Sequence, residues 1–114
     1  MTKHKVVLVP FPFDDLSSTK VRPAVCLTDP IGPHRHVVLA FTSRITNSLA
    51  TDLVLDASDP YFASSGLRGS STLQLHRLIT ATTSLIRREL GKLPPDLQAD
   101  LQDRRRKLFG LDNP

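Results

Sequence analysis

The chain has 114 residues, a length typical of one domain, and we expect residues 1–114 to form it. Hydrophobic residues make up 39% of the chain and charged residues 23%, which excludes wholesale disorder. The net charge of +4 permits an acidic partner such as nucleic acid but does not require one. A single cysteine, Cys26, excludes an intrachain disulfide, and its apolar neighbours predict a buried thiol. Neither a signal segment nor an apolar run of membrane-spanning length is present, so we expect a cytoplasmic protein.

Most of the chain has the character of short strands. Loops rich in Asp, Ser, Pro and Gly separate segments of high β-branched content. The expected strands are residues 4–9, 21–28, 36–42, 53–55 and 71–80. Short strands at this spacing predict an antiparallel barrel or a strongly curved sheet.

The last third of the chain has helical character. Ser84 is placed to cap a short helix over residues 85–90 that ends at Gly91. Pro94-Pro95-Asp96 then opens a longer helix, from Leu97 to about Phe109, with acidic residues early and basic residues late. The basic run at its end, residues 104–107, is either a solvated helix end or a contact for RNA. An apolar stripe recurs along this helix at Leu97, Leu101 and Leu108.

Four short motifs follow one another along the chain. The first is Val6-Val7-Leu8-Val9 running into Pro10-Phe11-Pro12-Phe13, and the second is Lys20-Val21-Arg22-Pro23-Ala24-Val25. The third is Val37-Val38-Leu39-Ala40-Phe41-Thr42-Ser43, and the fourth is Ser71-Thr72-Leu73-Gln74-Leu75-His76-Arg77-Leu78. With the later Leu85-Ile86 and Gly91-Lys92-Leu93, they resemble the PemK/MazF family of toxin ribonucleases over nearly the whole chain.

This resemblance implies a fold and a function. The implied fold is α+β: a small five-stranded antiparallel SH3-like barrel with a C-terminal helix. The implied function is that of the toxin in a type II toxin–antitoxin pair, a sequence-selective endoribonuclease that cuts single-stranded RNA through attack by the 2′-hydroxyl. The resemblance also implies a homodimer, a cognate antitoxin as partner, and no metal, cofactor or membrane.

The candidate catalytic residues are Arg22, Thr42 and His76. Cleavage by the 2′-hydroxyl places extra charge on the phosphoryl oxygens, and an arginine fork matches such oxygens. Pro23 biases Arg22 toward an extended backbone, so its side chain projects from a defined place at a strand mouth. The Thr42 hydroxyl can donate to the same phosphate, although Thr-Ser at a strand end is also common turn chemistry.

The expected RNA-binding residues are Phe13, Lys20, Ser43 and Gln74. Gln74 and His76 stand where some family members carry an arginine and an aspartate with acid–base roles. Glutamine cannot donate a proton at neutral pH, whereas histidine can act as acid or base. The alternative for His76 is a partly exposed sheet residue with no role in the reaction.

Two other functions stay open. A toxin of the same fold can poison DNA gyrase through protein contacts, and a relative without catalytic activity can bind nucleic acid. The histidines and Cys26 have no spacing typical of a metal site, so none is expected.

Overall fold

A computed structural model describes residues 2–10, 21–44 and 49–111 of the chain. Their strands form one antiparallel sheet with the order β4-β5-β3-β2-β1-β6. The strands are β1 (Lys5–Pro10), β2 (Val21–Cys26), β3 (His36–Ser43), β4 (Leu53–Leu55), β5 (Ser71–Thr82) and β6 (Arg88–Lys92). Two short 3₁₀ helices, η1 (Phe62–Ser65) and η2 (Thr83–Leu85), and the helix α1 (Pro95–Leu108) complete the described elements. Within these residues, no helix has the length and apolar character needed to cross a membrane.

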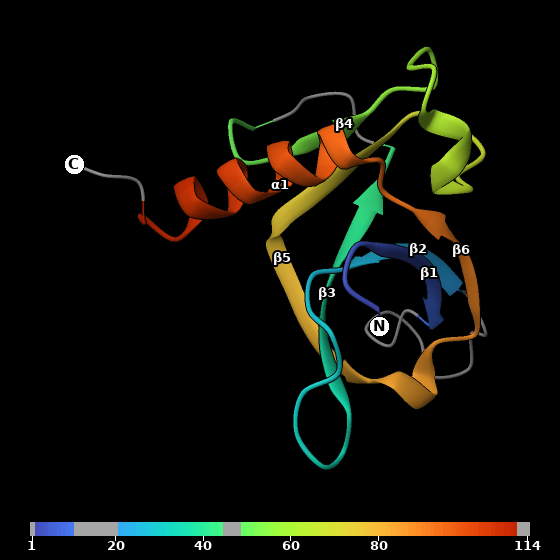
Figure 1. The fold of residues 1–114 in the computed structure, drawn as a ribbon, viewed down its shortest axis with the longest axis vertical. Coiled ribbons are helices and arrows are strands. Elements are labelled where there is room, and N and C mark those ends of the chain that lie inside the picture. The colour runs from blue at the N-terminus through green and yellow to red at the C-terminus, as the bar shows by residue number, and fades with distance from the viewer. Residues whose placement is uncertain (1, 11–20, 45–48, 112–114) are drawn as a thin grey trace.

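The sheet is strongly curled, so that β5 and β6 stand on opposite sides of β1 and β2 (Figure 1). One cause lies in β5, the longest strand. Thr42 of β3 pairs with Leu73, but Ala40 pairs with Leu78, so residues 74–77 of β5 stand opposite Phe41 alone. Extra residues on one strand bend it and increase its twist. Residues Ser71–Leu73 at the start of β5 also pair with β4, and residues 78–82 pair with β3 only.

Both faces of the sheet are apolar, which explains why consecutive residues of one strand are buried. In β1, Val6 belongs to one core cluster, and Val7 and Val9 belong to the other. Since neighbouring side chains of a strand point to opposite faces, each cluster covers one face. Cys26 lies in the second cluster and is fully buried, as expected from its sequence context.

Helix α1 covers the first core cluster near β4 and the start of β5 (Figure 1). Leu101 is buried in this cluster, and Leu97 and Leu108 pack against it, so the predicted apolar stripe is confirmed. The helix begins at Pro95. The backbone N–H of the first helical residue has no partner within a helix, so a proline at this position costs no hydrogen bond. Basic residues occupy the last turn of the helix. Arg104 ties the helix to the turn before β4 by donating to the carbonyl oxygens of Ala50 and Asp52.

The helix expected over residues 85–90 is wrong. Ser84 caps no helix there; its hydroxyl shares a hydrogen bond with Thr82, and η2 ends at Leu85. The chain then forms β6, which pairs with β1. The free edge of β1 has backbone donors and acceptors that a strand satisfies and a helix does not. A cross-strand ion pair between Lys5 and Glu89 accompanies this pairing.

The expected architecture of a curved antiparallel sheet with a C-terminal helix is confirmed. The five expected strands are all present, with ends shifted by no more than two residues, and β6 is the additional sixth. His4 lies just outside β1 because its φ of 72° is left-handed rather than extended.

Candidate functional site

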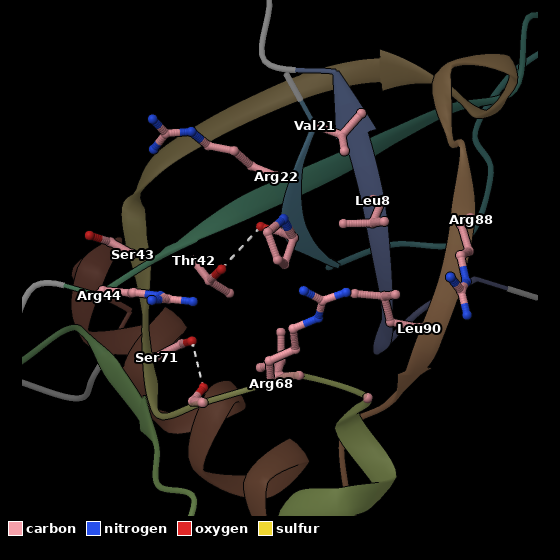
Figure 2. Close-up of a pocket in the computed structure, with 14 residues that line it drawn as sticks. Leu8, Val21, Arg22, Thr42, Ser43, Arg44, Arg68, Ser71, Arg88 and Leu90 are labelled. Carbon is pink, nitrogen blue, oxygen red and sulfur yellow. Dashed lines mark hydrogen bonds between the residues drawn. The ribbon is translucent and has the colours of Figure 1, made fainter. Parts of the chain in front are cut away.

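The main cavity of the described residues has a volume of about 640 Å³ and opens where the ends of several strands meet (Figure 2). Its described wall comes from six parts of the chain: β1, the start of β2, the end of β3 with Arg44 after it, the segment after η1, the start of β5, and β6. The residues that line it are Leu8, Val21, Arg22, Pro23, Thr42, Ser43, Arg44, Gly66, Leu67, Arg68, Gly69, Ser71, Arg88 and Leu90. Of these lining residues, all from the described ranges 2–10, 21–44 and 49–111, four are arginines and none is acidic, so this part of the cavity suits an anion.

The sheet brings Arg22 and Thr42 to this cavity together. Arg22 pairs with Val9 at the start of β2, and Thr42 stands near the end of β3, the neighbouring strand. The Thr42 hydroxyl donates to the carbonyl oxygen of Pro23, the residue that follows Arg22, at 3.2 Å. This bond fixes the Thr42 rotamer beside the arginine. The hydroxyl has a single proton, so it can join the guanidinium in donating to one phosphate only by giving up the bond to Pro23.

The other predicted residues divide into three groups. Ser43 lines the cavity beside Thr42. Phe13 and Lys20 lie outside the described residues, so their predicted roles stay predictions. Gln74 and His76 are described, but they do not line the cavity.

His76 instead faces the turn before β4. Its Nδ1 lies 3.6 Å from Oδ1 of Asp52, a carboxylate that is 1% exposed. The other oxygen of Asp52 accepts a hydrogen bond from the backbone N–H of Leu49 at 2.9 Å. The structure therefore gives His76 a carboxylate neighbour outside the cavity, and its catalytic role stays a prediction.

Among the residues missed by sequence reasoning are the three other arginines of the described lining, namely Arg44, Arg68 and Arg88. Arg44 directly follows the Thr42-Ser43 motif, so extending that motif by one residue would have found it. Arg88 lay in the segment expected to be helical. Its position follows from β-pairing with Leu8, another cavity residue, and no local pattern encodes that pairing. Arg68 lies in a loop, where only the fold decides the direction of a side chain.

Metal ligation and thiol chemistry find no support in the described part of the chain. Residues 2–10, 21–44 and 49–111 contain no group of three His, Cys, Asp or Glu side chains that could hold a metal ion. Burial raises the pKa of the Cys26 thiol to about 11, so the thiolate is disfavoured at neutral pH. The polar side chains among the described residues that line the cavity are those of arginine, threonine and serine.

Comparison with solved structures extends the fold assignment. The chain resembles the Mycobacterium tuberculosis toxin MazF-mt6 with a TM-score of 0.74 at 22% identity, covering 96% of this chain and 99% of that one. It resembles a mycobacterial endoribonuclease in complex with its cognate antitoxin with a TM-score of 0.71 at 17% identity, covering 100% and 99% of the two chains. A second mycobacterial endoribonuclease gives 0.70 at 15% identity, covering 98% and 94%. No curated protein sequence matches the chain.

The sequence itself matches one family model. That model describes the PemK-like, MazF-like toxin of type II toxin–antitoxin systems, and the match runs over residues 2–109. It includes the Arg22 and Thr42 motifs and every residue that lines the cavity. The chain therefore belongs to the PemK/MazF family of type II toxin–antitoxin toxins.

Proposed function

We propose that the chain is a sequence-selective endoribonuclease that cuts single-stranded RNA in the cytoplasm as the toxin of its pair. The observation that carries the proposal is the convergence of Arg22, Thr42 and three further arginines on one cavity, with no acidic residue among the described residues that line it. Family membership and two solved endoribonucleases of the same fold support it.

In the proposed reaction the cavity groups stabilise charge on the phosphate. The ribose 2′-oxygen attacks the adjacent phosphorus, its proton passes to a base, and the 5′-oxygen leaves and takes up a proton. The products are a 2′,3′-cyclic phosphate and a 5′-hydroxyl. Charge builds on the phosphoryl oxygens in the transition state, where fixed donors contribute most. We assign this stabilisation to the Arg22 guanidinium and the Thr42 hydroxyl, and we assign no metal ion to any step.

The decisive experiment compares RNA cleavage by the parent protein and by variants at Arg22 and Thr42. We expect Arg22→Ala to fold normally and to lose about 10²-fold or more in cleavage rate, the range typical of losing one transition-state donor. Arg22→Lys should rescue poorly because a point charge does not reproduce the planar fork. Thr42→Val keeps the side-chain shape and removes only the hydroxyl.

The control is Arg77→Ala, which removes an exposed arginine that does not line the cavity. It should cleave at the parental rate. A folded Arg22→Ala protein that also cleaves at the parental rate would overturn the site assignment. EDTA should leave cleavage unchanged; loss in EDTA with recovery on adding a divalent cation would overturn the metal-free mechanism.

Two assays separate the alternatives. RNA bound without cleavage would indicate a non-catalytic relative, and inhibition of DNA gyrase without RNA cleavage would indicate a gyrase poison. A toxin that poisons gyrase through protein contacts would not need Arg22 near Thr42 for chemistry.

We also propose a homodimer whose RNA site is blocked by its antitoxin. A 114-residue chain with few aromatic residues has a limited core, so burial against a second copy would add stability. A basic cavity is complementary to an acidic antitoxin segment, and one solved relative is held by its cognate antitoxin. Light scattering should report twice the chain mass at micromolar concentration. Antitoxin and RNA should compete for the protein; simultaneous binding without mutual loss of affinity would refute the blocking model.

A further inference from the structure

Three arginines of the cavity have no assigned task in the chemistry above. Arg44 follows β3, Arg68 lies in the segment after η1, and Arg88 belongs to β6. All three are exposed, and none forms an ion pair within the part of the chain that the structure describes. Like charges that surround one cavity repel each other, and an anionic ligand would relieve this repulsion.

The backbone on both sides of Arg68 is held in place by hydrogen bonds. The Ser65 hydroxyl donates to the carbonyl oxygen of Phe62 and accepts from the N–H of Leu67. After Arg68, the Ser71 hydroxyl donates to the carbonyl oxygen of Gly69 at 3.0 Å. The loop backbone is thus ordered without a ligand, which lowers the entropy cost of binding one.

Close packing against β6 also fixes the loop. Gly66 is left-handed, with φ 72°, and a Cβ placed on it would lie 2.5 Å from the carbonyl carbon of Leu90. The loop and β6 therefore touch backbone to backbone at this point, two residues before Arg68 and two after Arg88. This contact sets the relative positions of the two arginines.

In Figure 2 the guanidinium of Arg68 lies near the middle of the cavity, whereas the side chain of Arg22 extends toward its rim. Arg44 extends into the cavity from the side of Ser43. The cavity volume of about 640 Å³ exceeds what a single phosphate group needs, and its arginines come from four different elements. An extended polyanion with several phosphates matches this arrangement better than one small anion.

We propose that Arg68 binds an RNA phosphate next to the scissile one and sets the path of the strand past Arg22 and Thr42. Arg44 and Arg88 extend the same phosphate-binding track. This inference rests on the proposed function and adds a positioning residue to it. Since phosphate contacts carry no sequence information, Arg68 contributes affinity and register rather than base choice.

The test measures binding of an RNA oligonucleotide that carries a 2′-deoxyribose at the cleavage site, at several salt concentrations. Arg68→Ala should weaken binding about tenfold or more, as expected for a hydrogen bond to a charged group. The slope of log K against log salt should fall by about 0.7, the value for one phosphate contact on a single strand. On cleavable RNA, KM should rise by a similar factor, kcat should stay within about threefold of the parent, and the cleaved sequence should be the same.

Two further variants make the result specific. Arg87→Ala removes the exposed neighbour of Arg88, which does not line the cavity, and should leave affinity and slope unchanged. Arg88→Ala should lower the slope as Arg68→Ala does, so the track remains testable if Arg68→Ala folds poorly by circular dichroism. Arg68→Lys should restore the slope but only part of the affinity.

The outcomes distinguish this inference from the proposed function. If the parent protein cleaves RNA but Arg68→Ala and Arg88→Ala keep its affinity and slope, the track is refuted while the endoribonuclease stands. If Arg68→Ala lowers kcat with KM unchanged, Arg68 acts in the chemical step and its positioning role is overturned. If the parent protein neither binds nor cleaves RNA, that measurement alone refutes the proposed function and the track with it.

Discussion

The backbone contact between the η1 segment and β6 predicts a graded series of glycine substitutions. A Cβ added at Gly91 would lie 2.5 Å from the carbonyl carbon of Ser65, and one added at Gly66 would lie 2.5 Å from that of Leu90. Carbon atoms prefer a separation of about 3.5–4.0 Å, so each alanine forces two backbone segments apart by about 1 Å. Gly66 carries a second strain, because its φ of 72° is unfavourable for alanine.

The magnitudes follow from these two terms. Overpacking costs about 1–3 kcal/mol, and the contact here is with backbone that cannot rotate away, so Gly91→Ala should lose about 2–3 kcal/mol of unfolding free energy. The left-handed conformation adds about 1–2 kcal/mol, which brings Gly66→Ala to about 3–5 kcal/mol. A domain of this size is stable by about 5–15 kcal/mol, so Gly66→Ala removes a large share.

The chain offers matched controls for each term. Gly32 has a φ of 75° but open space around its Cβ position, so Gly32→Ala should cost only about 1 kcal/mol. Gly69 has neither strain, so Gly69→Ala should be neutral or slightly stabilising, by about 0.5 kcal/mol. Urea unfolding followed by circular dichroism measures all four variants. Equal midpoints for Gly91→Ala and Gly69→Ala would refute the close approach of η1 and β6.

The remaining predictions concern other parts of the molecule. His76→Ala should lower the unfolding free energy through the lost Asp52 contact. If His76 transfers a proton in the reaction, this variant should also lose about 10²-fold in cleavage rate and an inflection in the pH–rate profile, whereas an unchanged rate and profile would leave His76 without a catalytic role. The Cys26 thiol should resist alkylation in the native protein at pH 8 and react in urea, because burial raises its pKa to about 11; rapid native labelling would contradict this burial. Backbone N–H groups of Lys3 and Thr2 bond the Asp29 carboxylate at 3.0 and 2.9 Å and hold its pKa below the usual 3.8. Because the pKa of Asp29 is lower in the folded state, this stabilisation is complete above pH 3.8 and is lost as pH falls through the folded value. Asp29→Asn should therefore make the unfolding free energy depend less steeply on pH in acid. An unchanged acid dependence would show that the contact does not contribute to stability.

Local sequence patterns were enough to predict most of the fold. The strands β1, β2 and β3 contain runs of β-branched residues, and α1 contains leucines at helical spacing. These local patterns are enough to predict where each element lies in the sequence. β6 has no such pattern. Its sequence, Arg-Glu-Leu-Gly-Lys, is charged and follows a serine that resembles a helix cap. Its extended form depends on the free edge of β1, a partner more than 80 residues away.

Only those residues of the candidate site that lie within sequence motifs could be predicted. Arg22 and Thr42 were found because the motifs that contain them resemble those of the PemK/MazF family, and the pairing of β2 with β3 brings them together. His76 was found in the same way, from the position of its motif. The irregular pairing at residues 74–77, which bends β5, has no signal in the sequence, and the predicted residues of this stretch do not reach the cavity. Arg68 depends on the Gly66 contact with Leu90, which only tertiary structure creates.

The way in which β6 completes the cavity also governs when the site exists during synthesis. β1 leaves the ribosome first, but its edge partner and the cavity residues Arg88 and Leu90 follow about 80 residues later. Pairings so distant in sequence form slowly, since a long loop must close first. A ribosome-bound chain that stops before Leu90 therefore carries Arg22 and Thr42 without the wall opposite them. The assembled site therefore exists only once Leu90 has been made and β6 has paired with β1.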